Sequence, residues 1–214
     1  MLNFLENHDE QRIASDFFVA DARKGRAPLL VSALMCNNPF RLYFGQELGE
    51  KGMDQEGFSG LDGRTTIFDY WTVDTIRRWR NKGTFNGSLL TPDEQSLRRF
   101  YASVLRIKEQ EHAFAEGEFF DLMYQNPELH QQYVFARRGK GNVMLVVANF
   151  SEVEQRMQIN IPQHMFDLWN IKEKSGCSAI ELLTGQKVGI DFCSEKQFSA
   201  TVPALGGCVF KIGA

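Results

Sequence analysis

Long apolar runs are absent from this chain of 214 residues. The longest such run, residues 143–148, is far shorter than the about 20 residues that a membrane-spanning helix requires. No basic segment followed by an apolar stretch opens the sequence, so the pattern does not predict a secretion signal. We therefore expect no membrane partner, and the cellular compartment stays unassigned.

Closely spaced cysteines are also lacking. The cysteines are widely separated and form no Cys-x-x-Cys pair: Cys36, Cys177, Cys193 and Cys208. His130 and His164 have no partner at a spacing typical of metal ligands. The sequence therefore predicts neither a disulfide framework nor a zinc site, and we interpret the cysteines as buried free thiols.

An excess of positive charge is missing as well. The chain has 24 Lys and Arg against 27 Asp and Glu, a formal net charge of −3, so we expect no general attraction for nucleic acid. The chain is, in contrast, rich in hydrophobic residues. Hydrophobic residues make up 43% and include 18 phenylalanines, enough for the core of one large or two small domains.

The first half of the chain has the alternation of a parallel α/β fold. Residues 2–5 form an apolar run typical of a short buried strand, residues 25–36 carry an apolar helical face, and residues 40–44 read as a second strand. Residues 45–90 follow no clear period apart from a short helix candidate at 74–80. A stretch of this kind is typical of a long functional loop.

A helix start at Thr91 is the clearest local signal in the sequence. Thr91 can cap the helix, Pro92 suits its first position, and Glu94 completes a capping box. An apolar stripe at helical spacing then extends to about Glu111. The pattern predicts a helix from Thr91 to about Glu111.

After Gly117 the apolar period changes from helical to two. The pattern predicts a hairpin and several further short strands, at residues 133–138, 143–150, 157–161, 180–183, 188–192, 198–202 and 208–212. Such strands are typical of an antiparallel sandwich or barrel. We therefore divide the chain into an α/β part, residues 1–112, and an all-β part, residues 113–214.

The reactive cluster Asn7-His8-Asp9 directly follows the first predicted strand. Active-site residues of barrels lie at the carboxyl ends of parallel strands, and a carboxylate beside an imidazole suits a supporting role in glycoside hydrolysis. A loop held by local hydrogen bonds has the same composition. The tripeptide alone leaves both interpretations open.

The longer stretch Phe4-Leu5-Glu6-Asn7-His8-Asp9 resembles the fourth conserved region of the α-amylase family, the family 13 glycoside hydrolases. In that family the motif ends the seventh strand of a (β/α)8 barrel. The following segments resemble the family in the same order: residues 25–36 the seventh helix, 39–49 the eighth strand and its loop, 96–108 the eighth helix, 116–119 and beyond the C-terminal β-sandwich, and 63–71 a loop of some bacterial members. The resemblance covers nearly the whole chain and implies a partial (β/α)8 barrel, with strands 7–8 and helices 7–8, followed by an antiparallel β-sandwich.

The resemblance also implies roles for single residues. Asp9 corresponds to the catalytic carboxylate that stabilises the transition state, and His8 to the histidine that hydrogen-bonds the sugar in the same subsite. We expect Asn7 beside them to contribute to substrate binding. Glu47, in the loop after the eighth strand, would approach the substrate, or else serve as a structural carboxylate.

Other candidates have a structural interpretation of equal or greater weight. Tyr70 and Trp71 suit stacking on sugar rings, although burial is expected for at least one of them. Trp169 is a candidate sugar platform in the sandwich, with a packing role favoured. The arginines at positions 77, 78 and 80 are interpreted as a solvated face with local ion pairs.

Two catalytic segments of the family have no counterpart here. The nucleophile aspartate of a Gly-Phe-Arg-x-Asp type segment and the following acid/base glutamate are missing, and Asp62-Gly63-Arg64 is excluded as the first because it comes after the Asn7-His8-Asp9 motif. We therefore expect a C-terminal portion of a retaining enzyme for α-linked glucans or glucosides, inactive alone and liable to self-associate. Calcium, where family members use it, would be bound by the missing segments, so no cofactor is expected in this chain. The alternative is a non-catalytic carbohydrate-binding or structural β-sandwich module.

Overall fold

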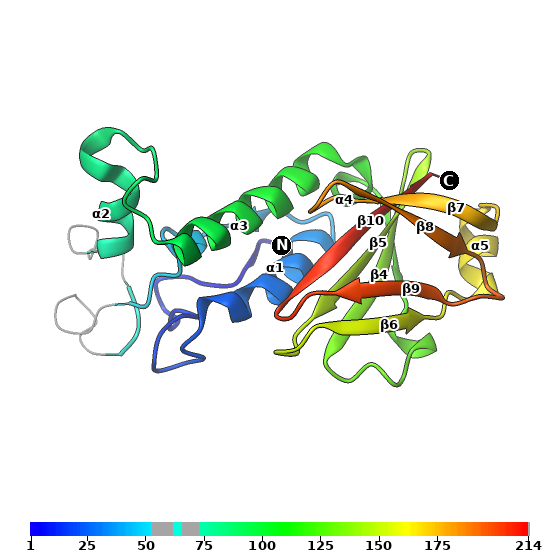
Figure 1. Ribbon diagram of the computed structural model, residues 1–214, viewed down its shortest axis with the longest axis horizontal. Helices are drawn as coiled ribbons and strands as arrows, with labels where there is room; N and C mark the ends of the chain where they lie inside the picture. The colour runs from blue at the N-terminus through cyan, green and yellow to red at the C-terminus, as the bar shows by residue number, and fades with distance from the viewer. Residues whose placement is uncertain (53–61, 66–72, 214) are drawn as a thin grey trace.

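The computed structural model describes residues 1–52, 62–65 and 73–213. Figure 1 shows an elongated molecule in which the N-terminal helices lie at one end and the β-strands at the other. No helix in the described part of the chain is long and apolar enough to cross a membrane.

The N-terminal half contains the predicted parallel α/β unit. Its elements are β1 (Asn3–Phe4), η1 (Ala22–Gly25), α1 (Arg26–Leu34), β2 (Phe40–Arg41), η2 (Gln46–Leu48), α2 (Asp74–Arg80), η3 (Asn81–Gly83) and α3 (Pro92–Gln110). Strands β1 and β2 pair in parallel. Both are shorter than predicted, because each has only the other as a ladder partner among the described residues.

The start of α3 follows the predicted capping box. The Thr91 hydroxyl accepts a hydrogen bond from the Glu94 amide at 3.2 Å, and the Glu94 carboxylate accepts one from the Thr91 amide at 2.8 Å. Arg78 of α2 forms an ion pair with the same carboxylate. Glu94 therefore completes the cap at the start of α3 and also links α2 to this helix.

The C-terminal half is antiparallel, as predicted. It comprises α4 (His112–Ala115), β3 (Glu118–Asp121), η4 (Met123–Gln125), β4 (Gln132–Gly139), β5 (Asn142–Asn149), β6 (Gln155–Ile159), α5 (Gln163–Trp169), β7 (Lys174–Glu181), β8 (Gln186–Phe192), β9 (Phe198–Val202) and β10 (Gly206–Gly213). One sheet has the order β3-β4-β5-β10-β7-β8, and β6 pairs with β9 in a second. The fold class predicted from the sequence is confirmed.

Two apolar clusters hold the molecule together. The first fills the space between the two sheets and α5, and includes Leu145, Trp169 and Phe198. The second joins the helices to the other face of the large sheet, where α1 packs on β5 and β10, α4 packs on β4 and β5, and α3 packs on α1 and α4. Gly207 allows this close approach, because a Cβ there would lie 2.4 Å from Leu30 Cδ1. Residues on both sides of the predicted boundary therefore share one core.

Arg137 of β4 is buried at this junction. Its guanidinium donates hydrogen bonds to the carbonyl oxygens of Met35 (2.8 Å), Ala113 (3.0 Å) and Gly117 (2.8 Å), and to the side chain of Asn37. Burial lowers the pKa of this guanidinium, and no described carboxylate lies within ion-pair distance of it. Arg137 thus supplies hydrogen-bond donors to backbone carbonyls near the ends of α1 and α4, which would otherwise be buried without partners.

Replacing Arg137 by methionine is expected to destabilise the chain by about 3 kcal/mol, because several buried acceptors lose their donor. Urea unfolding measures the change. The matched control is Arg138→Met, which removes the adjacent, partly exposed arginine and its 3.4 Å ion pair with Glu118. That change should cost less than about 1 kcal/mol. Equal losses in the two variants would contradict the role assigned to Arg137.

The pH dependence of stability should include a contribution from Glu94. Burial opposes its ionisation, but hydrogen bonds from Arg78 and Thr91 outweigh burial and place its pKa below the ordinary 4.5. A carboxyl with a lowered folded-state pKa contributes stability above its unfolded pKa and loses it as the pH falls. Unfolding measured below about pH 5 should therefore show a shallower acid loss in Glu94→Gln than in the parent chain. Parallel pH profiles would contradict this.

Candidate active-site segment

The loop after β1 presents Asn7-His8-Asp9 on the surface. The Asn7 side-chain oxygen accepts hydrogen bonds from the amides of Asp9 at 2.7 Å and Glu10 at 2.9 Å. Asparagine commonly forms turns of this kind. In this structure the Asn7 oxygen therefore shapes the loop, while its amide nitrogen has no described partner.

His8 and Asp9 lie side by side. His8 Nε2 is 3.4 Å from Asp9 Oδ2, and the two side chains are 50% and 72% exposed. Neither carboxylate oxygen of Asp9 accepts a hydrogen bond from a donor elsewhere in the described chain. The pair is therefore accessible to a ligand that offers hydroxyl groups.

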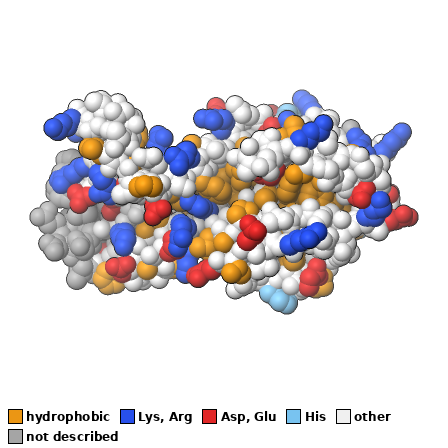
Figure 2. Space-filling model, viewed as in Figure 1, with side chains coloured by type: hydrophobic (Ala, Val, Ile, Leu, Met, Phe, Trp, Pro, Cys, Tyr) orange, Lys and Arg blue, Asp and Glu red, His pale blue; other side chains and the backbone are white. Residues whose placement is uncertain are grey.

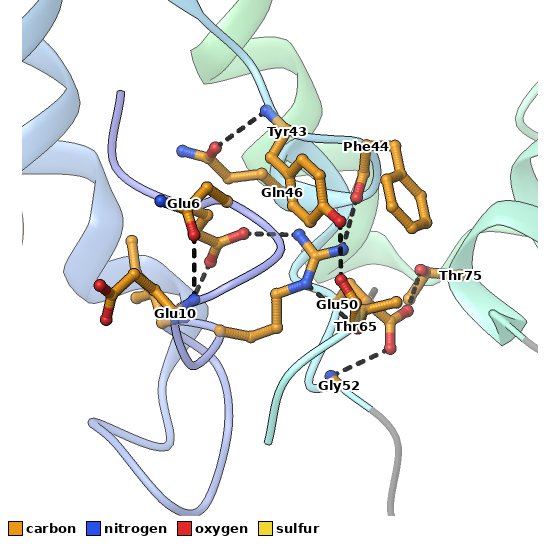
Figure 3. A network of polar contacts seen from close by, with 12 residues as sticks. Glu6, Glu10, Tyr43, Phe44, Gln46, Glu50, Gly52, Thr65 and Thr75 are labelled. Atoms are coloured by element: carbon orange, nitrogen blue, oxygen red, sulfur yellow. Dashed lines mark hydrogen bonds and ion pairs between the residues drawn. The ribbon is translucent and has the colours of Figure 1, made fainter. Parts of the chain in front are cut away.

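A buried arginine lies beneath this loop. Arg12 is fully buried, and its guanidinium donates to Glu6 Oε2 at 2.7 Å, to the Phe44 carbonyl at 2.7 Å and to Thr65 Oγ1 at 3.2 Å. Figure 3 shows Glu6, Phe44 and Thr65 gathered around the guanidinium, with the Tyr43 ring stacked at 4.4 Å. Each of the three guanidinium nitrogens thus donates a hydrogen bond, as burial of the charge requires.

Glu6 closes the loop from the other side. Its second oxygen accepts a hydrogen bond from the Ile13 amide at 2.8 Å. Burial raises the pKa of Glu6, and the charge and hydrogen bond of Arg12 oppose that shift. The Glu6 side chain therefore forms hydrogen bonds with Arg12 and Ile13. These bonds hold both ends of the intervening loop, which carries His8 and Asp9.

The described part of the predicted insert packs against the same loop. The Gly63 carbonyl accepts a hydrogen bond from the Arg12 amide at 2.8 Å. Gly63 has φ +77°, and a Cβ there would lie 2.0 Å from Ser15 Oγ, so a larger residue would displace the segment. The hydrogen bond that Arg64 donates to the Asp62 carboxylate raises the pKa of Arg64, with smaller contributions from the charges of Asp9 and Glu10. Tyr70 and Trp71 lie outside the described residues.

Glu47 occupies a different environment. It lies in η2, which packs on α3, and its Oε2 atom is buried without a hydrogen-bond partner among the described residues. Burial raises the pKa of this carboxyl, opposed by the charges of Arg98 and Arg12. No contact in the described chain joins Glu47 to His8 or Asp9, so its substrate role stays a prediction.

The remaining candidates have the structural roles favoured from the sequence. Trp169 is 1% exposed and packs edge-on against Phe120, so it is part of the core. Arg77 pairs with Asp74 at 3.4 Å, and Arg78 pairs with Glu94.

The described residues also contain no cluster of side chains suited to binding a metal ion. All four cysteines are free, with Cys193 and Cys208 buried. In the described ranges no three His, Cys, Asp or Glu side chains come together in a way that could hold a metal ion.

Sequence reasoning identified the exposed residues of this loop but missed Glu6 and Arg12. A signal for them exists. A glutamate in an apolar lead and an arginine shortly after the polar cluster are charges that need partners once the strand is buried. Their pairing with each other depends on the turn at Asn7, which the spacing alone does not specify.

The fold is similar to part of the fold of several solved α-amylases. Comparison with protein-family models gives no match, and comparison with curated proteins also gives none. Solved structures do match over almost the whole chain. AmyP in complex with maltose is 15% identical, with 98% of this chain and 40% of that chain covered and a TM-score of 0.64. The maltogenic α-amylase AmyB from Thermotoga neapolitana is 15% identical, with 100% and 41% covered and a TM-score of 0.63.

An α-amylase from Geobacillus thermoleovorans, complexed with acarbose, gives 13% identity, coverage of 100% and 39%, and a TM-score of 0.61. The chain thus spans about 40% of the length of the first two of these solved structures. The resemblance inferred from the sequence is confirmed at the level of the fold.

The Glu6–Arg12 pair can be tested by a double-mutant cycle. Arg12→Met should destabilise the chain by about 3–5 kcal/mol, because it leaves Glu6 buried without its partner. The double variant Glu6→Met/Arg12→Met should lose clearly less than the sum of the two single losses. Urea unfolding of all four chains measures the coupling. Additive losses would show that the two residues act separately.

Proposed function

We propose that this chain is the C-terminal portion of a retaining α-amylase-like glycoside hydrolase that acts on α-linked glucans or glucosides. The exposed Asp9 carboxylate carries the proposal, because it stands beside His8 on a braced loop at the end of a parallel strand. The shared fold supports it, as do the maltose and acarbose complexes of two similar enzymes.

Asp9 would act through its negative charge. Cleavage of a glycosidic bond passes through an oxocarbenium-like transition state, in which positive charge develops on the sugar ring. A carboxylate hydrogen-bonded to ring hydroxyls interacts more strongly with that state than with the ground state, which lowers the barrier. His8, 3.4 Å away, would donate a second hydrogen bond to the same sugar.

The braced loop would supply the precision that this interaction needs. A catalytic group contributes fully only when its position is fixed before the reaction. Glu6, Arg12 and Asn7 supply that constraint without occupying the Asp9 carboxylate. We assign these three residues a positioning role.

We further propose that the nucleophile and the acid/base carboxylate belong to polypeptide outside these 214 residues. A retaining mechanism needs these two groups about 5 Å apart, and Asp9 alone cannot perform either step. The similar solved chains are much longer than this one, which supports the proposal. Calcium, where such an enzyme binds it, would also be held outside this chain.

The test compares Asp9→Asn with Glu10→Gln in the longer polypeptide that carries this segment. Asp9→Asn should lower kcat on maltooligosaccharides by about a thousandfold or more, because the transition state loses its charge partner. Glu10→Gln neutralises the adjacent exposed carboxylate and should leave kcat within about twofold. Unchanged circular dichroism would show that both variants fold.

The 214-residue chain alone should not cleave maltodextrin. Turnover by the isolated chain that disappears on Asp9→Ala would contradict the proposal. So would an Asp9→Asn enzyme that keeps its activity.

A further inference from the structure

An apolar groove lies on the strand-rich half of the molecule, away from the Asp9 loop. Figure 2 shows hydrophobic side chains gathered in a hollow across the middle of this face. The groove has a volume of about 630 Å³ and runs over β10, between β8 and β9. Apolar groups line most of it, among them Leu183, Val188, Ala200, Pro203 and Phe210.

The two buried polar side chains in its wall, Glu181 and Cys208, already have hydrogen-bond partners. The Glu181 carboxylate accepts hydrogen bonds from the amides of Leu183, Thr184 and Val209 at 2.8–3.1 Å, and from the Thr184 hydroxyl at 2.7 Å. Cys208 Sγ donates to the Thr201 carbonyl, and burial raises the pKa of this thiol to about 12. The buried part of the wall therefore offers a sugar few free hydrogen-bond partners, whereas an aliphatic chain needs none.

The groove continues into a basic end beside α3. A second hollow of about 330 Å³ shares Phe100 and Leu183 with the first and is bordered by Arg26, Arg99 and two serines. Arg26 donates to Ser96 Oγ at 3.2 Å, while its Nε is buried without a hydrogen-bond partner among the described residues. Arg99 is exposed and makes no ion pair within the described chain.

Charge at this end favours an anion. Burial lowers the pKa of Arg26, and the nearby charge of Arg23 lowers it further. The charges of Asp21, which is paired with Arg23 at 2.8 Å, and of Asp93 oppose the shift without cancelling it. A carboxylate placed between Arg26 and Arg99 would supply the missing acceptor and offset the excess of positive charge.

We propose that the groove binds a fatty-acid-like monocarboxylate, with its carboxylate at Arg26 and Arg99 and its unbranched chain over Phe100 and Leu183 toward Val188. The combined hollows are in the range of small-ligand sites. The apolar floor and the single basic end match the two parts of such a ligand.

Calorimetric titration of the 214-residue chain with octanoate, decanoate and 1-octanol tests the proposal. Decanoate should bind with one-to-one stoichiometry, and each added methylene should tighten binding by about threefold to fourfold. The alcohol should bind at least about tenfold more weakly than octanoate, because it lacks the charge-assisted bonds. No saturable binding, or equal affinity for octanoate and 1-octanol, would overturn the proposal.

Arginine variants locate the site. Arg26→Gln and Arg99→Gln should each weaken decanoate binding by about tenfold and leave 1-octanol binding unchanged. The control is Arg106→Gln, which removes the same charge from an exposed position further along α3 that does not line the groove. Because Arg99 is exposed, its variant should fold normally. Equal effects of all three variants would indicate nonspecific charge attraction and overturn the assignment.

A variant in the apolar part tests where the chain lies. Val188→Glu puts a carboxylate in the path of the aliphatic chain and should abolish binding of decanoate and 1-octanol, with thermal unfolding as the check on folding. Competition between maltoheptaose and decanoate would instead identify a sugar site. Displacement of decanoate by an acidic apolar peptide at lower concentration would identify a peptide groove. Either result would overturn the proposal.

Discussion

The packing of α1 on one face of the six-stranded sheet, with α3 packed on α1, is the constraint on which the rest of the structure depends. Leu30, Leu34 and Val104 share one buried cluster with Val146 and Val209 of the sheet. Hydrogen bonds and an ion pair surround this cluster. Lys108 donates to one carbonyl in the last turn of α1 and to one just after it. Arg137 donates to the carbonyl of the residue that follows α1, and Lys211 pairs with Glu111 at 2.8 Å. Because β1 and β2 flank α1 in the chain, fixing this helix also fixes the strand that leads to Asp9.

A second, local constraint shapes the candidate active-site loop. In the proposed function Asp9 is open to a substrate, yet a loosely held carboxylate would contribute little to a transition state. The structure meets both needs by burying Glu6 and Arg12 below the loop and leaving His8 and Asp9 outside. In the strand-rich half, backbone amides likewise donate hydrogen bonds to the buried Glu181 carboxylate, and an apolar groove lies beside it.

Elements with strong local signals agree with the sequence-based predictions. The capping box at Thr91, the hairpin around Gly141 and the alternation of residues 198–202 each depend on neighbours in the chain, and all three are found. Strand lengths were less predictable, because a strand ends where its partner ends, as β1 and β2 show. Helix α5 was missed since its short apolar stretch after Pro162 has no period long enough to distinguish it from a loop.

The sequence by itself determined the strand–helix–strand order of the first half, the change from helical to alternating period, and the identity of the exposed pair His8 and Asp9. Those features depend on local pattern and on a motif whose residues are contiguous. Only the tertiary structure decided that Arg12 pairs with Glu6, that Arg137 joins the two halves, and that Arg26 and Arg99 end an apolar groove. These contacts connect segments far apart in the chain or across a turn, and their partners are chosen by packing and burial, which no single stretch of sequence specifies.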